Sequence, residues 1–240
     1  MMRPKFNICV FCGSKSGNNP IYQTIAGHLV KQMAKREIGL VYGGASIGLM
    51  GTIATECLET GGYVVGVLPE ILTPYEIAHS GLSQLINTNS MHERKAMMYQ
   101  LSNAFIALPG GVGTLDELFE IVTWAHLDIH KKPIVLLNIA EFFDPLLTYL
   151  NHTVKEGFVS DQLRSLIRVY DDVELMLDDL QEDFLTVDAN TLAISSQKST
   201  DEYSLLVEEL KLQQDISNVN IEKNLYNSMQ LNEIQTVTEQ

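Results

Sequence analysis

Glu117 and Arg94 are the two charged residues whose neighbours in the chain point to chemistry. Glu117 follows the glycine-rich stretch LPGGVGT at 108–114. A glycine-rich turn that opens a helix directs backbone N–H groups at an anion, and the helix dipole adds to the attraction. A carboxylate one turn later can act on what the loop holds. The structural alternative is a capping box, because Thr114-Leu115-Asp116-Glu117 has its spacing.

Arg94 lies in the run MHERK at 91–95, which is typical of a helix. Arg94 and Lys95 could bring positive charge to the same site, and a guanidinium recognises phosphate or carboxylate through two parallel bonds. The alternative is a solvated helix face with Glu93 and Lys95 turned outward. Taken alone, the run favours the solvated face.

Two further polar residues are candidates for binding a ligand. Ser14 ends the first strand's loop and could bind a hydroxyl or a phosphate, although a turn role fits it equally well. Glu76 lies in the long connection 69–89, where a surface position is the default.

Apolar runs alternate with amphipathic stretches along most of the chain. The runs expected as strands are 6–12, 39–44, 63–68, 104–108, 133–138 and a short one at 167–172. Helices are expected up to about 36 and over about 47–60, 90–101, 114–127 and 142–157. This order predicts an α/β, Rossmann-like, doubly wound parallel sheet with helices on both faces. Ligands bind such sheets at the carboxyl ends of the strands, where the glycine-bearing loops 12–14, 43–51 and 110–114 fall.

Composition limits the possible partners and the domain organisation. The chain has 240 residues, 45% of them hydrophobic, and a formal net charge of −14, which argues against nucleic acid but not against a small phosphorylated ligand. Three cysteines fit the cytoplasm, and no apolar run reaches the roughly 20 residues of a membrane helix. Residues 1–185 form the expected catalytic domain. Residues 186–240 form an acidic, polar tail, partly helical or disordered.

Several familiar motifs are missing from the sequence. Neither the dinucleotide fingerprint nor a P-loop occurs, so the glycine loop fits a mononucleotide better. Cys9 and Cys12 should lie on opposite faces of a strand, which disfavours a redox pair. No histidine spacing suggests a metal site.

Taken together, the motifs resemble the LONELY GUY family of cytokinin riboside 5′-monophosphate phosphoribohydrolases, many of which carry an older lysine decarboxylase label. The resemblance covers about residues 6–183. The segments that carry it are VYGGASIGLMG (41–51), MHERKA (91–96), FIALPGGVGTLDELFE (105–120), TWAHLDIHKKP (123–133) and LLN (136–138).

The resemblance implies cleavage of the N-glycosidic bond of a nucleoside 5′-monophosphate, either a cytokinin riboside 5′-monophosphate or AMP. By motif, Arg94 and Glu117 would be catalytic, with Glu76 and Lys95 binding the substrate. The loop would hold the phosphate through Gly110, Gly111, Val112, Gly113 and Thr114. The resemblance also implies homodimers or larger homo-oligomers and no cofactor.

Three residues depart from the family pattern and leave base preference open, namely Ala45, Asn103 and His126. A carrier or nucleotide-binding protein without turnover stays as an alternative function. A pyridoxal-phosphate decarboxylase is a third possibility, but it needs a Schiff-base lysine for which no motif is found.

Overall fold

The computed structural model describes residues 3–72 and 78–195. These residues build one seven-stranded parallel sheet with the order β4-β3-β2-β1-β5-β6-β7. The strands are β1 (Asn7–Phe11), β2 (Gly39–Tyr42), β3 (Val64–Pro69), β4 (Gln84–Thr88), β5 (Ala104–Ala107), β6 (Ile134–Leu137) and β7 (Ile167–Tyr170). The predicted doubly wound fold is confirmed.

The central strand β1 pairs with β2 on one side and with β5 on the other. Cys9 lies opposite Val41 of β2 and opposite Phe105 of β5. Every residue of β1, β2, β3, β5 and β6 is buried, which is why these strands read as continuous apolar runs. Strands β2 to β4 are added on one side of β1, and strands β5 to β7 are added on the other side. A crevice is therefore expected at the carboxyl ends of β1 and β5, where the strand order switches.

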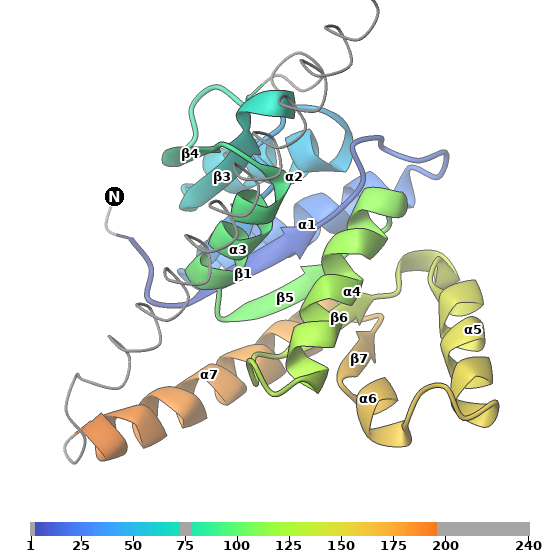
Figure 1. Cartoon of the computed structure of the whole chain (residues 1–240). Coiled ribbons are helices and arrows are strands. Elements are labelled where there is room, and N and C mark those ends of the chain that lie inside the picture. Colours follow the sequence, from blue (N-terminus) through green and yellow to red (C-terminus); the bar gives the residue numbers. More distant parts are fainter. Residues whose placement is uncertain (1–2, 73–77, 196–240) are drawn as a thin grey trace, which may run out of the picture. The chain divides into compact units, whose positions relative to one another are not determined.

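Helices cover both faces of the sheet (Figure 1). The helices are α1 (Ile21–Lys35), α2 (Gly48–Glu59), α3 (Met91–Leu101), α4 (Val112–His126), α5 (Asp144–Lys155), α6 (Asp161–Ser165) and α7 (Val173–Ser195), with short 3₁₀ turns at Glu70–Leu72 and Ile139–Glu141. Helices α1, α2 and α7 pack on one face, while α3, α4, α5 and α6 pack on the other. Cys12 belongs to the first core and Cys9 to the second, so the predicted separation of the two thiols is confirmed.

The sequence prediction missed one strand. The connection 69–89 contains β4, which pairs with β3 at one edge of the sheet. Its residues QLINT are mostly exposed, so they show no apolar run. The predicted boundary between residues 185 and 186 falls inside α7, and residues 196–240 of the tail lie outside the described part. Across the described ranges, every helix is too short or too polar to cross a membrane.

Candidate active site

Arg94 is held on the buried face of α3. Ser90 caps this helix by accepting a 3.1 Å hydrogen bond from the backbone N–H of Glu93. The Glu93 carboxylate in turn accepts a 2.8 Å bond from the Asn89 N–H, which closes the first turn. With the start of the helix fixed, Arg94 and Met98, one turn apart, both face the sheet and are buried. The alternative of a solvated face is therefore wrong for Arg94.

Glu117 lies on the buried face of α4 and pairs with Arg94. Its Oε1 accepts a 2.7 Å hydrogen bond from Nη1 of Arg94. The two residues are only 8% and 6% exposed. A charge-assisted bond in this environment is strong, and losing one partner of a buried pair typically costs about 3–5 kcal/mol. The two motifs of the sequence thus meet in one buried ion pair.

The capping-box alternative for Glu117 is wrong. Helix α4 begins at Val112, with Gly111 as its N-cap and no side-chain cap. Thr114 is therefore inside the first turn, where it is buried rather than capping. The sequence allowed this alternative because the spacing of threonine and glutamate matches that of a capping box. The true helix start lies earlier because glycine can take the N-cap position without a side chain.

Burial raises the pKa of the Glu117 carboxyl, and Arg94 offsets part of that rise. The helix dipole near the N-terminus of α4 favours the ionised form of this carboxyl. That contribution is outweighed, because loss of hydration disfavours the charged form. A glutamate with a raised pKa is closer to the protonation range of a general base or acid at neutral pH.

Lys95 lies next to Arg94 on α3 and contacts α4. Its Nζ is 3.2 Å from Oδ2 of Asp116 and 3.1 Å from Oε2 of Glu120. Only 13% of its side chain is exposed, so it does not project into solvent as the solvated-face alternative required. Arg94 and Lys95 are consecutive residues of α3. Arg94 binds Glu117 of α4, and Lys95 binds the acidic residues that precede and follow Glu117 in the chain.

The three glycine-bearing loops meet at the carboxyl edge of the sheet. The Gly13 N–H donates to the Pro109 carbonyl at 3.1 Å, and the Gly13 carbonyl accepts from the Leu49 N–H at 3.1 Å. A Cβ on Gly110 would stand 2.1 Å from Oγ1 of Thr114 and 2.9 Å from the Gly13 nitrogen. Glycine is required at 110 because the two loops touch there.

The N-terminus of α4 is open to a ligand. Among the described residues, and apart from the adjoining backbone, no atom lies within 4 Å of the place where a Cβ would stand on Gly111 or Gly113. The first turn of a helix leaves its N–H groups without intrahelical acceptors, so they can bind an anion. Ser14 is exposed and lines a cavity of about 350 Å³ together with Gly110 and Gly111. Lys95 and Val112 line a second hollow of about 400 Å³ between α3 and α4.

Sequence reasoning missed the backbone partner of Arg94. Nε of Arg94 donates to the Val67 carbonyl at 3.2 Å, at the end of β3. Every residue has a backbone carbonyl, so residue types alone could not show which carbonyl Arg94 would bind. Glu76 falls outside the described residues, so its expected role in substrate binding has no structural test. In the described ranges no cluster of three or more His, Cys, Asp or Glu side chains could hold a metal ion.

The departures from the family pattern at Ala45 and Asn103 have structural settings. Ala45 is fully buried and forms an isolated bridge with Ala78. Oδ1 of Asn103 accepts a 2.9 Å hydrogen bond from the Asn7 N–H at the start of β1. A carboxylate could accept the same bond, so asparagine here needs no functional explanation.

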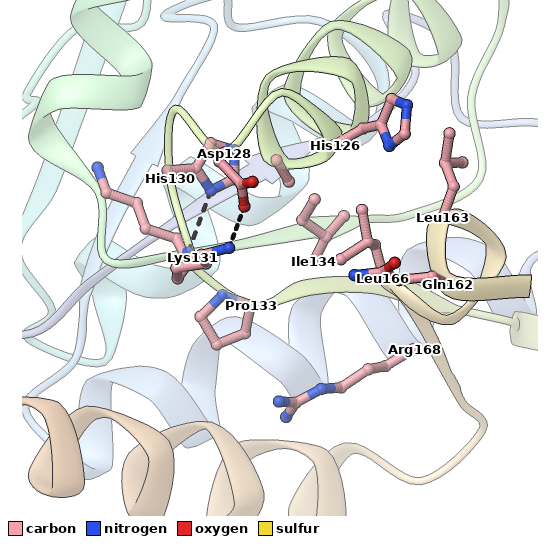
Figure 2. A pocket seen from close by; sticks show the side chains of 12 residues that line it. His126, Asp128, His130, Lys131, Pro133, Ile134, Gln162, Leu163, Leu166 and Arg168 are labelled. Carbon is pink, nitrogen blue, oxygen red and sulfur yellow. Dashed lines mark hydrogen bonds and ion pairs between the residues drawn. The ribbon is translucent and has the colours of Figure 1, made fainter. Parts of the chain in front are cut away.

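His126 is at the opposite end of α4 from the glycine loop, about 21 Å along the helix axis from Val112. It lines a pocket of about 290 Å³ at the amino ends of β6 and β7 (Figure 2). Within the same chain, His126 therefore cannot contact a ligand at the α4 N-terminus. The expectation that it affects base preference receives no support from its position.

The charged groups of the pocket beside His126 already have ion-pair or hydrogen-bond partners. Lys131 forms an ion pair with Asp128 (Figure 2), and Nη1 of Arg168 lies 2.5 Å from Oδ2 of Asp183. Nε2 of His130 must donate to the Ile121 carbonyl at 3.0 Å, and Nδ1 accepts from the Lys132 N–H at 3.1 Å. This pattern fixes a neutral ring, and burial lowers the pKa of His130 accordingly. The pocket holds structural polar groups.

Comparison with known proteins decides the family. A family model described as "Possible lysine decarboxylase" matches residues 50–180. The chain is 48% identical over 169 residues to a cytokinin riboside 5′-monophosphate phosphoribohydrolase of Rhodococcoides fascians, covering 70% of this chain and 85% of that protein. The chain belongs to the LONELY GUY family. Against LOG2 of Arabidopsis thaliana, named for the same activity, the identity is 49% over 160 residues, or 67% and 75% of the two chains.

Solved structures extend the LONELY GUY fold to more distant proteins. A structure of the molybdenum cofactor carrier protein from Chlamydomonas reinhardtii is 26% identical, with a TM-score of 0.55, covering 74% of this chain and 97% of that chain. A molybdenum cofactor binding protein from Rippkaea orientalis is 19% identical with a TM-score of 0.56, covering 77% and 99%. The second likeness shows the fold alone. The same sheet therefore also occurs in proteins named for binding or carrying a ligand.

Proposed function

We propose that this chain hydrolyses the N-glycosidic bond of a nucleoside 5′-monophosphate, releasing the free base and ribose 5-phosphate. The substrate is a cytokinin riboside 5′-monophosphate, AMP or both. The observation that carries the proposal is the buried Arg94–Glu117 pair beside the open N-terminus of α4. The 48–49% identity to proteins named as phosphoribohydrolases supports it.

The phosphate is held at the start of α4. The N–H groups around Gly111, Val112 and Gly113 supply donors, and the helix dipole favours a dianion there. Gly110 and Thr114 fix the conformation of the loop, because the Thr114 side chain packs where a Cβ on Gly110 would stand. Ser14 faces the same cavity from the β1 loop and adds a hydroxyl. The remaining substrate contacts fall to Glu76 and Lys95.

Glu117 acts at the ribose. Cleavage of a glycosidic bond passes through an oxocarbenium-like transition state, in which positive charge grows on the sugar. A carboxylate close to C1′ stabilises that charge and orients the attacking water or removes its proton. Arg94 binds only Oε1 of Glu117, and among the described residues Oε2 has no hydrogen-bond partner. Oε2 is the oxygen that faces the reaction. The water oxygen bonds to C1′ as the C1′–N bond breaks, and the base leaves with the bonding electron pair. The proton that Glu117 takes from the water is passed on to the departing base, so the carboxylate is restored.

The phosphate is a remote handle on the substrate. Binding energy gained there orients the sugar against Glu117, so it accelerates the reaction without taking part in it. Removing the phosphate from the substrate should therefore lower kcat as well as raise KM.

The competing function is a carrier that binds a nucleotide without cleaving it. The fold likeness to proteins named as molybdenum cofactor carriers favours it. The ion pair favours the enzyme, because a carrier has no need of a buried glutamate with a raised pKa. Stabilisation by AMP in a thermal-shift assay without release of adenine would favour the carrier.

The residues present do not fit pyridoxal phosphate, which the family description suggests. The cofactor would need a lysine amine free to form a Schiff base. The amine nearest the pair, Lys95 Nζ, is engaged by Asp116 and Glu120. We therefore propose a reaction without a cofactor.

One experiment tests the proposed function directly. The purified protein is incubated with AMP and with isopentenyladenosine 5′-monophosphate, and the products are separated by chromatography. Free base and ribose 5-phosphate in equal amounts support the enzyme, and the ratio of the two rates gives the base preference. Release of no base from either nucleotide would overturn the proposal.

We also propose a homodimer or a larger homo-oligomer in the cytoplasm, as the family resemblance implies. The Val112 side chain, 85% exposed at the start of α4, supports an apolar contact surface near the site. Light scattering after size-exclusion chromatography tests the assembly. The three free, buried thiols support a reducing compartment.

A further inference from the structure

Gly43 directly follows β2 and lies next to Nη2 of Arg94, the guanidinium nitrogen that is not bound to Glu117 or to Val67. The next glycine, Gly44, has a φ of +85°, a conformation that favours glycine. Gly43 is not among the residues with positive φ, so its backbone would accept a side chain. The space would not, because a Cβ on Gly43 would stand 2.3 Å from Nη2 of Arg94 and 3.0 Å from Sδ of Met50.

The guanidinium of Arg94 has no room to retreat from such a contact. Its Nε is bound to the Val67 carbonyl, and its Nη1 is bound to Glu117. The group is planar and rigid, so one corner cannot move alone. Reaching an ordinary van der Waals distance needs a shift of about 1 Å, which breaks or lengthens at least one of these two bonds.

We infer that Gly43 is a positioning residue for the reaction, because its missing side chain forms the slot that fixes the Arg94 guanidinium against Glu117. This inference rests on the proposed function. Gly43 touches no reacting atom and acts only through Arg94. The competing explanation is that Gly43 merely packs tightly against its surroundings, including Met50.

A double-mutant cycle separates the two explanations. The variants are Gly43→Ala, Arg94→Ala and the combination of both, since Arg94→Ala removes the guanidinium atoms that the new Cβ would meet and leaves only the 3.0 Å approach to Sδ of Met50. Gly43→Ala alone should lower kcat/KM for the better nucleotide by about 100-fold, mainly in kcat, because a displacement of about 1 Å at a catalytic group has this effect. In the Arg94→Ala background the same change should lower the melting temperature much less than it does in wild type, because only the approach to Met50 remains.

A second readout is the pH profile. The groups that face Glu117 are Arg94 and Lys95 from α3, Asp116 from α4 and the neutral thiols of Cys9 and Cys12 at β1. Only the contact with Arg94 changes in the Gly43→Ala variant. The acid limb of kcat/KM should therefore move to higher pH, which general loosening of the fold would not produce.

The matched control is Gly27→Ala, which adds a methyl group to another buried glycine. The atoms nearest to its Cβ would belong to the Glu56 side chain, the first of them at 3.3 Å, on the other face of the sheet. Activity should be unchanged. If Gly43→Ala does not fold alone, the double variant should have a stability close to that of Arg94→Ala, because the clash with the guanidinium is gone.

The inference is overturned by full activity of Gly43→Ala, or by an equal loss of melting temperature in both backgrounds. A double variant that fails to fold although Arg94→Ala folds would overturn it as well. If the wild-type protein cleaves no nucleotide, the proposed function fails by itself. The melting temperatures of the cycle then still decide whether Gly43 positions Arg94.

Discussion

The Arg94 guanidinium and the Glu117 carboxylate are in direct contact, with Nη1 and Oε1 2.7 Å apart, although 23 residues separate them in the chain. Each residue comes from a different helix, and both are buried against the carboxyl ends of the central strands. Because the pair joins α3 to α4, it ties the geometry of the site to the packing of the fold.

Replacing Glu117 by Gln should remove activity while keeping the fold. The amide can still accept a bond from Arg94, but it carries no charge and cannot take a proton from water. The expected loss in kcat is about 10²- to 10⁴-fold, the usual contribution of a general base. The rate of base release and the melting temperature measure the two effects. The control is Glu56→Gln, which changes a glutamate paired with Lys31 between α1 and α2 and should keep wild-type activity.

The pH dependence should report the raised pKa of Glu117. If catalysis needs the ionised carboxylate, kcat/KM should fall as pH decreases through a pKa above the ordinary 4.5 of glutamate. In Arg94→Met the attraction that lowers this pKa is gone, so the acid limb should move to higher pH. An acid limb at the same pH in both proteins would contradict the assignment.

The same shift has a consequence for stability. A carboxyl with a raised pKa in the folded state contributes stability that is fully present below its unfolded pKa and is lost as pH rises through the folded value. Relative to Glu117→Gln, wild type should therefore lose melting temperature as pH rises from 4.5 through the raised pKa of the folded protein.

Alanine at Gly110 should lower the stability of the fold, whereas alanine at Gly111 should weaken substrate binding. At Gly110 the new Cβ meets Thr114 and the β1 loop, which should cost about 1–3 kcal/mol of stability. At Gly111 no atom of the described residues beyond the adjoining backbone lies within 4 Å, so the melting temperature should stay constant while the methyl group occupies the proposed phosphate position. We expect a raised KM for AMP in Gly111→Ala. An unchanged KM there would place the phosphate elsewhere.

Because of Lys132, the free energy of unfolding should increase as pH rises through the alkaline range. Its Nζ donates to the Tyr99 carbonyl at 2.8 Å near the end of α3 and lies 3.8 Å from the centre of the Tyr99 ring. Burial nevertheless lowers the pKa of this amine to about 8, below its ordinary 10.5. The unfolded chain then binds more protons between these two values, so stability rises with pH there.

This rise should disappear in Lys132→Met, which keeps an apolar stem without an amine. Denaturant unfolding at pH 8 and pH 10 measures the difference between the two proteins. The control is Lys131→Met, because Lys131 is exposed and paired with Asp128 on the surface. A Lys132→Met protein with the same pH dependence as wild type would contradict the prediction.

By itself, the sequence determined the parallel sheet and the loops that carry the site. Strands buried on both faces, such as β1 and β5, are apolar throughout, and glycines mark the turns that follow them. The exposed edge strand β4 was missed for the same reason, since only one of its residues, Thr88, is buried. Periodicity detects burial, so an element with little buried surface leaves a weak signal.

Only the tertiary structure decided what the two charged motifs do. Local spacing allowed Glu117 to cap its own helix and Arg94 to face solvent, because each alternative depends on a few neighbouring residues alone. The choice was made by the packing of α3 and α4 against β1, β2 and β3, which buries both side chains and leaves each as the other's charged partner. Two opposite charges are stable in such a place only as a pair, and that constraint joins residues far apart in the chain.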